Sequence, residues 1–383
     1  MNKITSARIR GFRRLHDVEL EMRSLMVLIG ANGVGKTTFL DVFALLSASA
    51  AGNLSKKMAE LGGLDSMVTR NGTKELSLHV DVEVPGHQPL EYELRLQVAG
   101  IGHNISREAL YQKRPGSASP LKHIDSTLDN IRYFNPDNKK LLRPNWDHNP
   151  RETSLAQVPK MFQQPEELRK ILSGAVQYHV LDVHPGAPVK VPQKMRPSTL
   201  PGANGEDLVS LLYYLREQDP NRFEVILDTL HAAFGGFEWL SFPPVAAGTL
   251  TMLWKDKNFS EPIYIHELSE GTLRFLWLVT LLQSPGLSTV TMIDEPEVSL
   301  HPEQLNLLAD LMREASLRTQ LIVATHSDRL VRHLDPGEIL AMDIDEESGL
   351  TVATWADTLD LDRWLQDYCL DEVWQMGMLG ARA

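Results

Sequence analysis

Residues 30–38 read Gly30-Ala31-Asn32-Gly33-Val34-Gly35-Lys36-Thr37-Thr38 and match the phosphate-binding loop pattern G-x-x-x-x-G-K-[ST] at every required position. Glycines let consecutive backbone N–H groups turn toward a phosphate, a turn that side chains would obstruct. Lys36 can reach the β- and γ-phosphate oxygens, and the Thr37 hydroxyl can bind Mg²⁺. The stretch from Asn32 to Thr38 therefore predicts a binding site for ATP and Mg²⁺.

The residues around this loop support that prediction. Residues 25–29 are all apolar and predict a short buried strand, and residues 39–46 carry apolar positions at helical spacing. A helix that starts at the loop would direct the positive end of its dipole at the same phosphates. The alternative, a glycine-rich turn that carries a lysine by chance, explains neither neighbour.

The composition of the 383 residues is that of a globular protein, with 43% hydrophobic and 23% charged residues. The longest apolar run, residues 275–282, is too short to span a membrane, and residues 1–8 contain no apolar signal core. The one cysteine excludes an internal disulfide, so we expect a cytoplasmic protein with no membrane partner. A net charge of −12 argues against a surface that coats nucleic acid, although a basic segment at 8–14 lies close to the loop in sequence.

The pattern of apolar residues divides the chain into four parts. Residues 1–100 contain predicted strands, the loop and its helix, and residues 246–345 alternate strands and helices, which indicates a parallel sheet covered on both faces. Between them, residues 101–245 carry many prolines and turn residues, which predicts an inserted region with two helices at 207–217 and 222–234. Residues 346–383 form a C-terminal tail, with a helix expected at 360–375.

A second nucleotide motif follows about 260 residues after the loop. The apolar residues 290–293 predict a buried strand, which ends in Asp294 and Glu295. Asp294 would complete the Mg²⁺ site, and Glu295 would orient and deprotonate the attacking water. Buried strands often end in acidic residues, so this pair alone would be weak evidence. The interpretation rests on the phosphate loop that precedes the pair in the sequence.

Residues 268–272, Leu268-Ser269-Glu270-Gly271-Thr272, open a predicted helix just before that strand. Here the sequence resembles the ABC-type ATPases of the RecF, SMC and overcoming-lysogenization-defect branch, whose signature motif has the form L-S-x-G-x. A Ser hydroxyl and backbone N–H groups at a helix N-terminus form an anion site. The resemblance implies that Ser269 and Gly271 face the γ-phosphate bound by a second subunit, whereas the alternative is a plain helix cap at Ser269.

Three further stretches carry the same resemblance. Thr325-His326-Ser327 matches the switch histidine of the branch, so His326 would contact the γ-phosphate. Residues 295–302, with the sequence EPEVSLHP, resemble the E-P-E-x-x-L-H-P run of RecF-like and overcoming-lysogenization-defect ATPases and leave the role of His301 open. Residues 9–15 resemble its N-terminal I-x-N-F-R-x-L element, with Gly11 in place of the usual Asn, which implies that Arg13 lies near the phosphates; a solvated basic turn is the alternative. No glutamine fits the Q-loop, because Gln88 and Gln97 fall on a predicted hairpin.

The resemblance implies an α/β fold, namely an ABC-type P-loop ATPase head with a mixed sheet flanked by helices, plus an inserted α+β region. It also implies ATP hydrolysis with ATP and Mg²⁺, in a homodimer or higher oligomer that closes around ATP. About forty residues follow the last core strand, too few for the nuclease domain of the overcoming-lysogenization-defect enzymes, and acidic residues 343–347 read as a solvated hairpin tip.

We therefore expect a switch or sensor subunit for a separately encoded nuclease or toxin, in anti-phage defence. The alternatives are a RecF-like clamp that binds DNA in repair and a nucleotide-dependent scaffold with little turnover.

Overall fold

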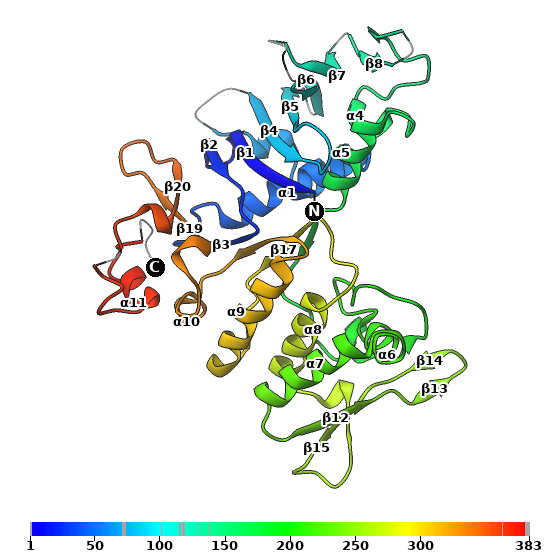
Figure 1. Cartoon of the computed structure of the whole chain (residues 1–383), viewed down its shortest axis with the longest axis vertical. Coiled ribbons are helices and arrows are strands. Elements are labelled where there is room, and N and C mark those ends of the chain that lie inside the picture. The colour runs from blue at the N-terminus through cyan, green and yellow to red at the C-terminus, as the bar shows by residue number, and fades with distance from the viewer. Residues whose placement is uncertain are drawn as a thin grey trace.

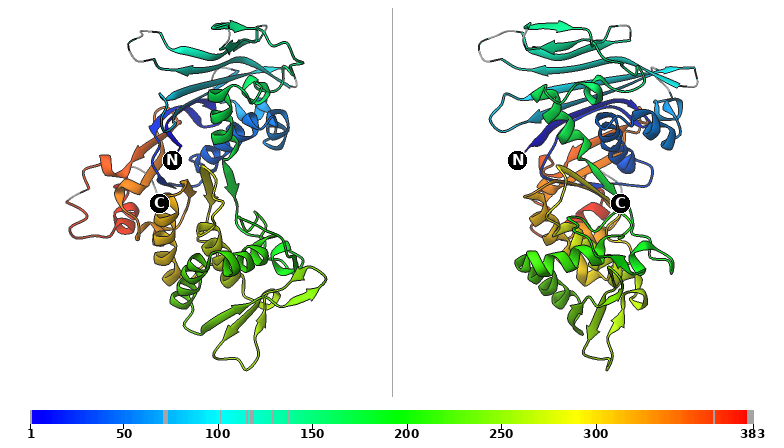
Figure 2. Two further views of the ribbon diagram at one scale, coloured as in Figure 1. Left: turned by 45° about the vertical axis from the view of Figure 1, so that its right-hand side comes forward. Right: turned by 90° about the vertical axis from the view of Figure 1, so that its right-hand side faces the viewer.

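The chain forms a central mixed sheet with an antiparallel sheet at one end and a helical lobe at the other (Figure 1). This architecture comes from a computed structural model that describes residues 2–70, 74–100, 102–114, 116, 119–128, 130–136, 138–361 and 363–379. Figure 2 shows the antiparallel sheet, here called the arm, and the helical lobe on opposite sides of the central sheet.

The central sheet has the strand order β10-β17-β18-β3-β19-β20. Its strands run parallel except β20, which pairs antiparallel with β19. Their bounds are β3 Leu25–Ile29, β10 Val176–Tyr178, β17 Val290–Asp294, β18 Gln320–Ala324, β19 Ile339–Ile344 and β20 Thr351–Trp355. The predicted mixed sheet of an α/β fold is confirmed.

Strand β3 shows why this sheet is buried on both faces. Leu25, Val27 and Ile29 pack into the core shared with the helical lobe, whereas Met26 and Leu28 pack into the core shared with the arm. Because successive side chains of a strand point to opposite faces, a continuous apolar run is needed where both faces are covered.

The arm is a long antiparallel sheet with the strand order β2-β1-β4-β5-β6-β7-β8-β9. Helices α1 and α5 contact one another beside it, and the short helices α2, α3 and α4 fill the remaining space. The bounds are β1 Lys3–Phe12, β2 Leu15–Glu21, β4 Glu75–Glu83, β5 Leu90–Ala99, β6 Gly102–Gln112, β7 Leu121–Thr127, β8 Tyr133–Asn135, β9 Lys140–Leu142, α1 Lys36–Ala50, α2 Leu54–Glu60, α3 Leu64–Met67, α4 Ser154–Gln157 and α5 Gln163–Ser173.

The expected start of an insertion after residue 100 needs correction. Strand β6 pairs with β5 along its whole length, so residues 102–142 extend the N-terminal sheet. The alternation of β6 is hard to read in sequence because the register shifts between Arg95 and Leu96, and its middle residues are only half-buried.

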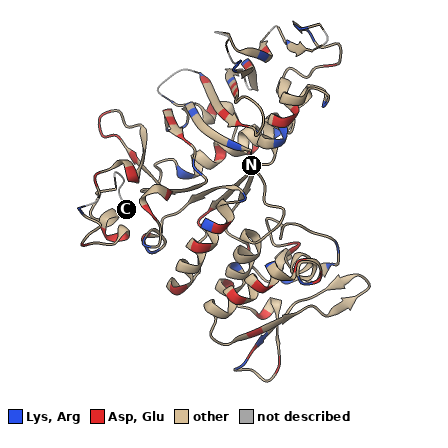
Figure 3. Cartoon of the chain, viewed as in Figure 1, with Lys and Arg blue, Asp and Glu red and all other residues tan. Residues whose placement is uncertain are grey.

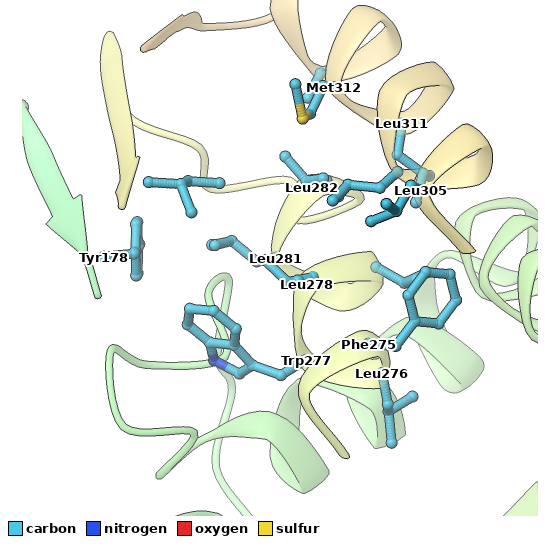
Figure 4. Close-up of a cluster of buried hydrophobic side chains, with 14 of the residues drawn as sticks. Tyr178, Phe275, Leu276, Trp277, Leu278, Leu281, Leu282, Leu305, Leu311 and Met312 are labelled. Atoms are coloured by element: carbon cyan, nitrogen blue, oxygen red, sulfur yellow. The ribbon is translucent and has the colours of Figure 1, made fainter. Parts of the chain in front are cut away.

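The helical lobe follows β10 and is built on α6, α7, α8 and α9. Figure 4 shows side chains of α8 meeting Tyr178 on one side and α9 on the other, and the Trp277 indole lies 5.8 Å from the Tyr178 ring. The predicted pair of helices around Asp219-Pro220 is present, with Asp219 as the N-cap of α7. The bounds are α6 Leu208–Gln218, α7 Pro220–Ala233, α8 Glu270–Leu282 and α9 Pro302–Ser316.

Small sheets and short helices complete the chain. Two small antiparallel sheets cover the end of the lobe: β11 Gln193–Lys194, β13 Pro244–Ala246 and β14 Thr249–Leu250 in one, β12 Phe237–Ser241, β15 Leu253–Asp256 and β16 Ile263–Tyr264 in the other. The short helices are η1 Pro188–Lys190, η2 Ile265–Glu267, α10 Asp328–Val331, η3 Pro336–Glu338, η4 Ala356–Thr358 and α11 Leu370–Gln375.

The C-terminal tail also differs from the prediction. Residues 351–355 form strand β20 of the central sheet, and the expected helix at 360–375 is limited to α11, which is preceded by turns. The acidic residues 343–347 lie at the end of β19 and in the turn toward β20, as expected for a hairpin. None of the helices in the described ranges combines the length and apolarity needed to cross a bilayer.

Candidate nucleotide site

The carboxyl ends of three neighbouring parallel strands meet at one edge of the central sheet. In register, Asp294 of β17 lies opposite Ala324 of β18, and Ala324 lies opposite Leu28 of β3. The phosphate loop, the acidic pair and His326 each follow one of these strands. Three segments separated by up to 290 residues in sequence therefore converge.

The phosphate loop adopts the backbone geometry that its glycines allow. Gly30 has φ 137°, and a Cβ there would lie 2.1 Å from the Met342 carbonyl oxygen, so a side chain has no room. Gly35 has φ 114° and precedes α1 without a side-chain cap, which leaves the first N–H groups of the helix free of a capping side chain. Asn32 and Gly33 are exposed at the tip of the loop. This uncapped N-terminus fits a phosphate group.

The other loop residues are placed by α1. Val34 is buried, Thr37 is exposed and Thr38 is half-buried in the first turn of the helix. The Val34 carbonyl accepts a hydrogen bond of 2.6 Å from the Thr351 hydroxyl. Strand β20 therefore supports the loop from the side away from β18.

Lys36 is 5% exposed, and its ammonium group lies against the backbone of the phosphate loop. Nζ donates to the carbonyl oxygens of Gly30 at 2.5 Å and Ala31 at 3.1 Å. Burial lowers the pKa of Lys36 to about 8, although the nearby carboxylates of Asp294, Glu295 and Glu297 act in the opposite direction. A phosphate would give this buried cation the anionic partner that would favour its charged form.

The oxygen ligands expected for Mg²⁺ lie side by side. Thr37 Oγ1 is 3.5 Å from Asp294 Oδ2, at the end of β17. Burial and the neighbouring Glu295 raise the pKa of Asp294, as expected for a buried carboxylate placed beside another. A hydroxyl and a carboxylate are hard oxygen donors of the type that Mg²⁺ prefers, so this pair fits the ion.

Glu295 and His326 lie at the same edge. Glu295 has φ 52°, an uncommon left-handed conformation, and its N–H donates to the Ala324 carbonyl at 2.8 Å. His326 Nδ1 is 3.2 Å from Lys36 Nζ, and Nε2 is 3.9 Å from Glu295 Oε1. Burial, and then the charge of Lys36, lowers the pKa of His326, which favours the neutral imidazole. His326 thus lies between Lys36 and Glu295.

Glu297 is a residue of this site to which the sequence assigned no role. Its Oε1 accepts hydrogen bonds from the Thr325 hydroxyl at 2.6 Å and from the His326 N–H at 3.2 Å. Burial raises the pKa of Glu297. The second glutamate of the E-P-E run, which was visible in the sequence, therefore orients the segment that carries His326.

His179 is a second residue that motif reasoning missed. It follows β10, the strand next to β17, and its Nδ1 lies 3.9 Å from Asp294 Oδ2. Gln97 lies within β5 and Gln88 between β4 and β5, as predicted for a hairpin, so neither belongs to this edge of the central sheet. No local signal marks it, because β10 has only three residues.

The signature stretch lies at the start of α8. Ser269 is the N-cap, exposed to solvent, and its Oγ accepts from the Thr272 N–H at 3.2 Å. A Cβ at Gly271 would lie 2.4 Å from the Ser299 carbonyl oxygen, so glycine is required for this contact. Arg274 donates to the Ser299 hydroxyl and, at 3.2 Å, to the Leu181 carbonyl. The signature helix is therefore tied to the segment after Glu295 and to the segment after His179.

No hydrogen bond joins Ser269 to the phosphate loop of the same chain within the ranges that the structure describes. The structure thus brings together Lys36, Thr37, Asp294, Glu295 and His326, and leaves Ser269 and Gly271 on an exposed helix end.

Arg13 lies beside α1. Its Nη1 is 2.6 Å from Asp41 Oδ2, one helical turn beyond Thr37, and its φ of 49° belongs to the turn between β1 and β2. A hollow of about 510 Å³ adjoins it, lined by Arg13, Arg14, Ser66, Val68, Thr69, Arg70, Gly349 and Leu350. A direct contact between Arg13 and phosphate stays a prediction. His301 caps α9 by accepting from the Glu303 N–H at 3.4 Å.

The family model described as "AAA domain, putative AbiEii toxin, Type IV TA system" matches residues 25–332. The chain belongs to this family. The match begins at β3 and ends just after α10, so this AAA domain includes the phosphate loop, the acidic pair and His326. No curated protein matches the chain.

Solved structures of SMC heads share the fold of this AAA domain. An SMC head bound to the C-winged helix domain of ScpA has a TM-score of 0.53 at 16% identity, with 93% of this chain and 99% of that chain covered. An SMC head with an extended coiled coil, bound to the C-terminal domain of ScpA derived from Pyrococcus furiosus, has a TM-score of 0.53 at 13% identity and covers 96% and 99%. One derived from Pyrococcus yayanosii gives a TM-score of 0.53 at 11% identity and the same coverage.

At such identities the likeness establishes the fold, which is that of an ABC-type P-loop ATPase head. Family and fold together are those of a nucleotide-binding ATPase.

Proposed function

We propose that the protein hydrolyses ATP at the carboxyl edge of β3, β17 and β18. One observation carries this proposal: a buried lysine, a Thr–Asp pair and a Glu–His pair lie together although three separate segments supply them. ATP and Mg²⁺ would supply the phosphoanhydride bond and the cation that neutralises charge during its cleavage.

The chain's own residues would divide the work. Backbone N–H groups from Asn32 to Thr38 and the ammonium of Lys36 would hold the phosphates, with Arg13 nearby. Thr37 and Asp294 would hold Mg²⁺. Glu295 would orient a water and accept its proton, and the neutral His326 would donate a hydrogen bond toward the γ-phosphate.

Two substitutions separate binding from chemistry. Lys36→Ala should lose ATP binding because it removes the cation that contacts the phosphates. Glu295→Gln should retain ATP and lose turnover because the amide keeps the size of the side chain and removes the base. Nucleotide retention and phosphate release measure the two properties, and wild-type turnover in Glu295→Gln would remove Glu295 from this role.

We also propose that two copies close around ATP, with Ser269 and Gly271 of one copy against the γ-phosphate held by the other. The exposed end of α8, which makes no hydrogen bond to its own phosphate loop within the described ranges, supports this arrangement. ATP should then drive dimer formation in sedimentation, most clearly in Glu295→Gln. A Glu295→Gln protein that stays monomeric with saturating ATP and Mg²⁺ would contradict the arrangement.

The biological role that we propose is a cytoplasmic switch subunit for a separately encoded nuclease or toxin in anti-phage defence. The description of the family as a putative toxin–antitoxin component supports a partner of this kind. Residues 101–245, which contain the distal part of the arm and helices α6 and α7 of the helical lobe, would bind the partner, because closure of two α8 helices would move these regions relative to each other.

Co-expression with the neighbouring gene product, followed by cross-linking with and without ATP, tests this role. We expect cross-links in 101–245 that change with ATP. Cross-links confined to the central sheet, or no stable partner, would favour the RecF-like DNA clamp instead.

A further inference from the structure

The end of the arm farthest from β1 differs in charge from the rest of the chain. Residues 107–160, here called the distal arm, contain ten Lys or Arg and six Asp or Glu, a formal net charge of +4 in a chain of net charge −12. They comprise most of β6, all of β7, β8 and β9, and the segment through α4 that leads toward α5. Figure 3 shows Lys and Arg among the strands and turns at this end of the molecule.

The cations of the distal arm are available for an outside partner. Among the residues that the structure describes, six exposed cations have no carboxylate within 4.0 Å; these are Arg114, Lys139, Lys140, Arg143, Arg151 and Lys160. Nearer the central sheet the pattern is the opposite, since Arg8 and Arg10 pair with Asp17 at 3.3 and 3.0 Å. Arg8 and Arg10 are thus paired with a carboxylate on their own sheet, whereas these six cations of the distal arm are not.

Two acids of the distal arm, Glu108 and Asp125, are already engaged by groups of the same chain. Glu108 is buried and accepts from the Leu155 N–H at 2.8 Å, and burial raises its pKa. Asp125 is buried among Arg107, Lys122 and Arg132, all within 3.3 Å. The net charge of +4 in the distal arm, together with its unpaired exposed cations, therefore favours an anionic partner.

A groove of about 340 Å³ runs between β7, β8 and the start of α5. Its lining offers flat or flexible apolar side chains, notably the half-buried Phe134 and Phe162 and the 81% exposed Met161, with the amides of Gln163 and Gln164 beside them. Lys160 directly precedes Met161, and the Lys139-Lys140 turn follows Phe134 in the same hairpin. His123 also lines the groove; burial lowers its pKa to about 4, and the charge of Arg114 acts in the same direction.

From this juxtaposition we infer that the distal arm binds single-stranded nucleic acid, with phosphates on the cations and one or more bases in the groove. Aromatic and sulfur-containing side chains receive the faces of unpaired bases, whereas a base pair inside a duplex presents only its edges. An acidic peptide would satisfy the cations and leave the groove unexplained. The inference goes beyond ATP hydrolysis and does not depend on it, because the distal arm contains none of the proposed catalytic residues.

Fluorescence anisotropy with labelled single-stranded DNA and RNA of about twenty nucleotides tests the inference on the full chain. Lys139→Glu/Lys140→Glu should weaken binding about tenfold and reduce the slope of log K against log salt by about 1.4. The matched control is Lys190→Glu/Lys194→Glu, which makes the same change of charge on the helical lobe and should leave the affinity within about twofold. Met161→Glu tests the groove at an exposed position and should also weaken binding.

Each other outcome overturns the inference. Equal loss in both double variants would show that net charge alone controls binding. Stronger binding of duplex than of single strands, or full competition by poly-glutamate at the same charge concentration, would show that the groove does not receive bases. Wild-type affinity in Lys139→Glu/Lys140→Glu would place the nucleic acid elsewhere or exclude it.

Discussion

The central sheet and the arm use strands in two different ways. In the central sheet, short buried strands end at one edge, and reactive side chains follow these ends, as Glu295 does directly after β17 and His326 does two residues after β18. In the arm, long strands alternate buried and exposed residues, and the charged side chains spread over one face, as the Arg95–Glu93 pair does. In the central sheet, the position of a residue relative to the end of a strand therefore indicates its function. In the arm, only the balance of paired and unpaired charges indicates function.

This comparison predicts that substitutions in the arm change stability and leave nucleotide chemistry intact. Glu108→Ala should have the largest effect, about 3 kcal/mol lower free energy of unfolding, because the N–H groups of Ser154 and Leu155 and the Tyr92 hydroxyl lose their acceptor inside the protein. Urea unfolding measures the loss. ATP retention at a temperature where the variant is folded should equal that of the wild type, and a specific loss of ATP binding would break the distinction between the two sheets.

For α8, which contacts the edge of the central sheet, we expect the reverse: substitutions change nucleotide chemistry more than stability. Gly271→Ala places a Cβ 2.4 Å from the Ser299 carbonyl, so α8 must shift against the segment after Glu295. Turnover and ATP-driven dimerisation should fall by about tenfold or more, equivalent to at least about 1.4 kcal/mol, while ATP retention persists.

The matched control is Gly235→Ala in the same lobe, where an added Cβ meets no atom within 4 Å. It should leave turnover and dimerisation unchanged. Equal effects of the two substitutions would show that the contact between Gly271 and Ser299 has no special role.

His179 tests whether the edge strand β10 belongs to the nucleotide site. His179→Ala should weaken binding of Mn²⁺–ATP and Mg²⁺–ATP by up to about tenfold because it removes a side chain 3.9 Å from Asp294. Binding of ATP without metal should not change, and this difference separates a role toward the ion from a general structural role. Equal losses with and without metal would exclude the role toward the ion.

The smallest effect concerns the outer face of the arm. A hydrogen bond to Asp81, and the nearby Glu91 and Glu93, raise the pKa of His79. Because the folded-state pKa lies above the unfolded value, this stabilisation is fully present below about pH 6.5 and disappears as the pH rises through the folded-state pKa. The pair is about one-third exposed, so we expect only a few tenths of a kcal/mol after screening by solvent. Urea unfolding of His79→Gln and the wild type at pH 5.5 and 8.5 measures it, and an identical pH dependence in both would contradict the assignment.

The sequence was most informative where a short motif lies next to the end of a buried strand. Lys36, Thr37, Asp294 and His326 each stand in a short motif beside a buried strand, and parallel pairing brings strand ends together, so their convergence could be predicted. His179 could not be predicted, because a strand of three residues gives no periodic signal and its contact with Asp294 depends on a pairing 115 residues away in sequence.

The arm shows a different limit of sequence reasoning. Strands β6 and β7 lack a clean alternation because register shifts place neighbouring residues on unexpected faces. Their pairing with β5 is fixed by contacts along the whole sheet, which no local window contains. The insertion expected to start after residue 100 was therefore placed too early, although the helices of the lobe were located correctly.

The central claim is that the edge of the central sheet forms half of a site that the α8 end of a second copy completes. Equal amounts of Lys36→Ala and Ser269→Arg chains, each inactive alone, test it most directly. In a mixed dimer one composite site combines an intact loop with an intact Ser269, so random mixing should restore about one quarter of wild-type phosphate release. Activity that stays at the level of the separate variants, with mixed dimers verified by a tag on one chain, would contradict the account.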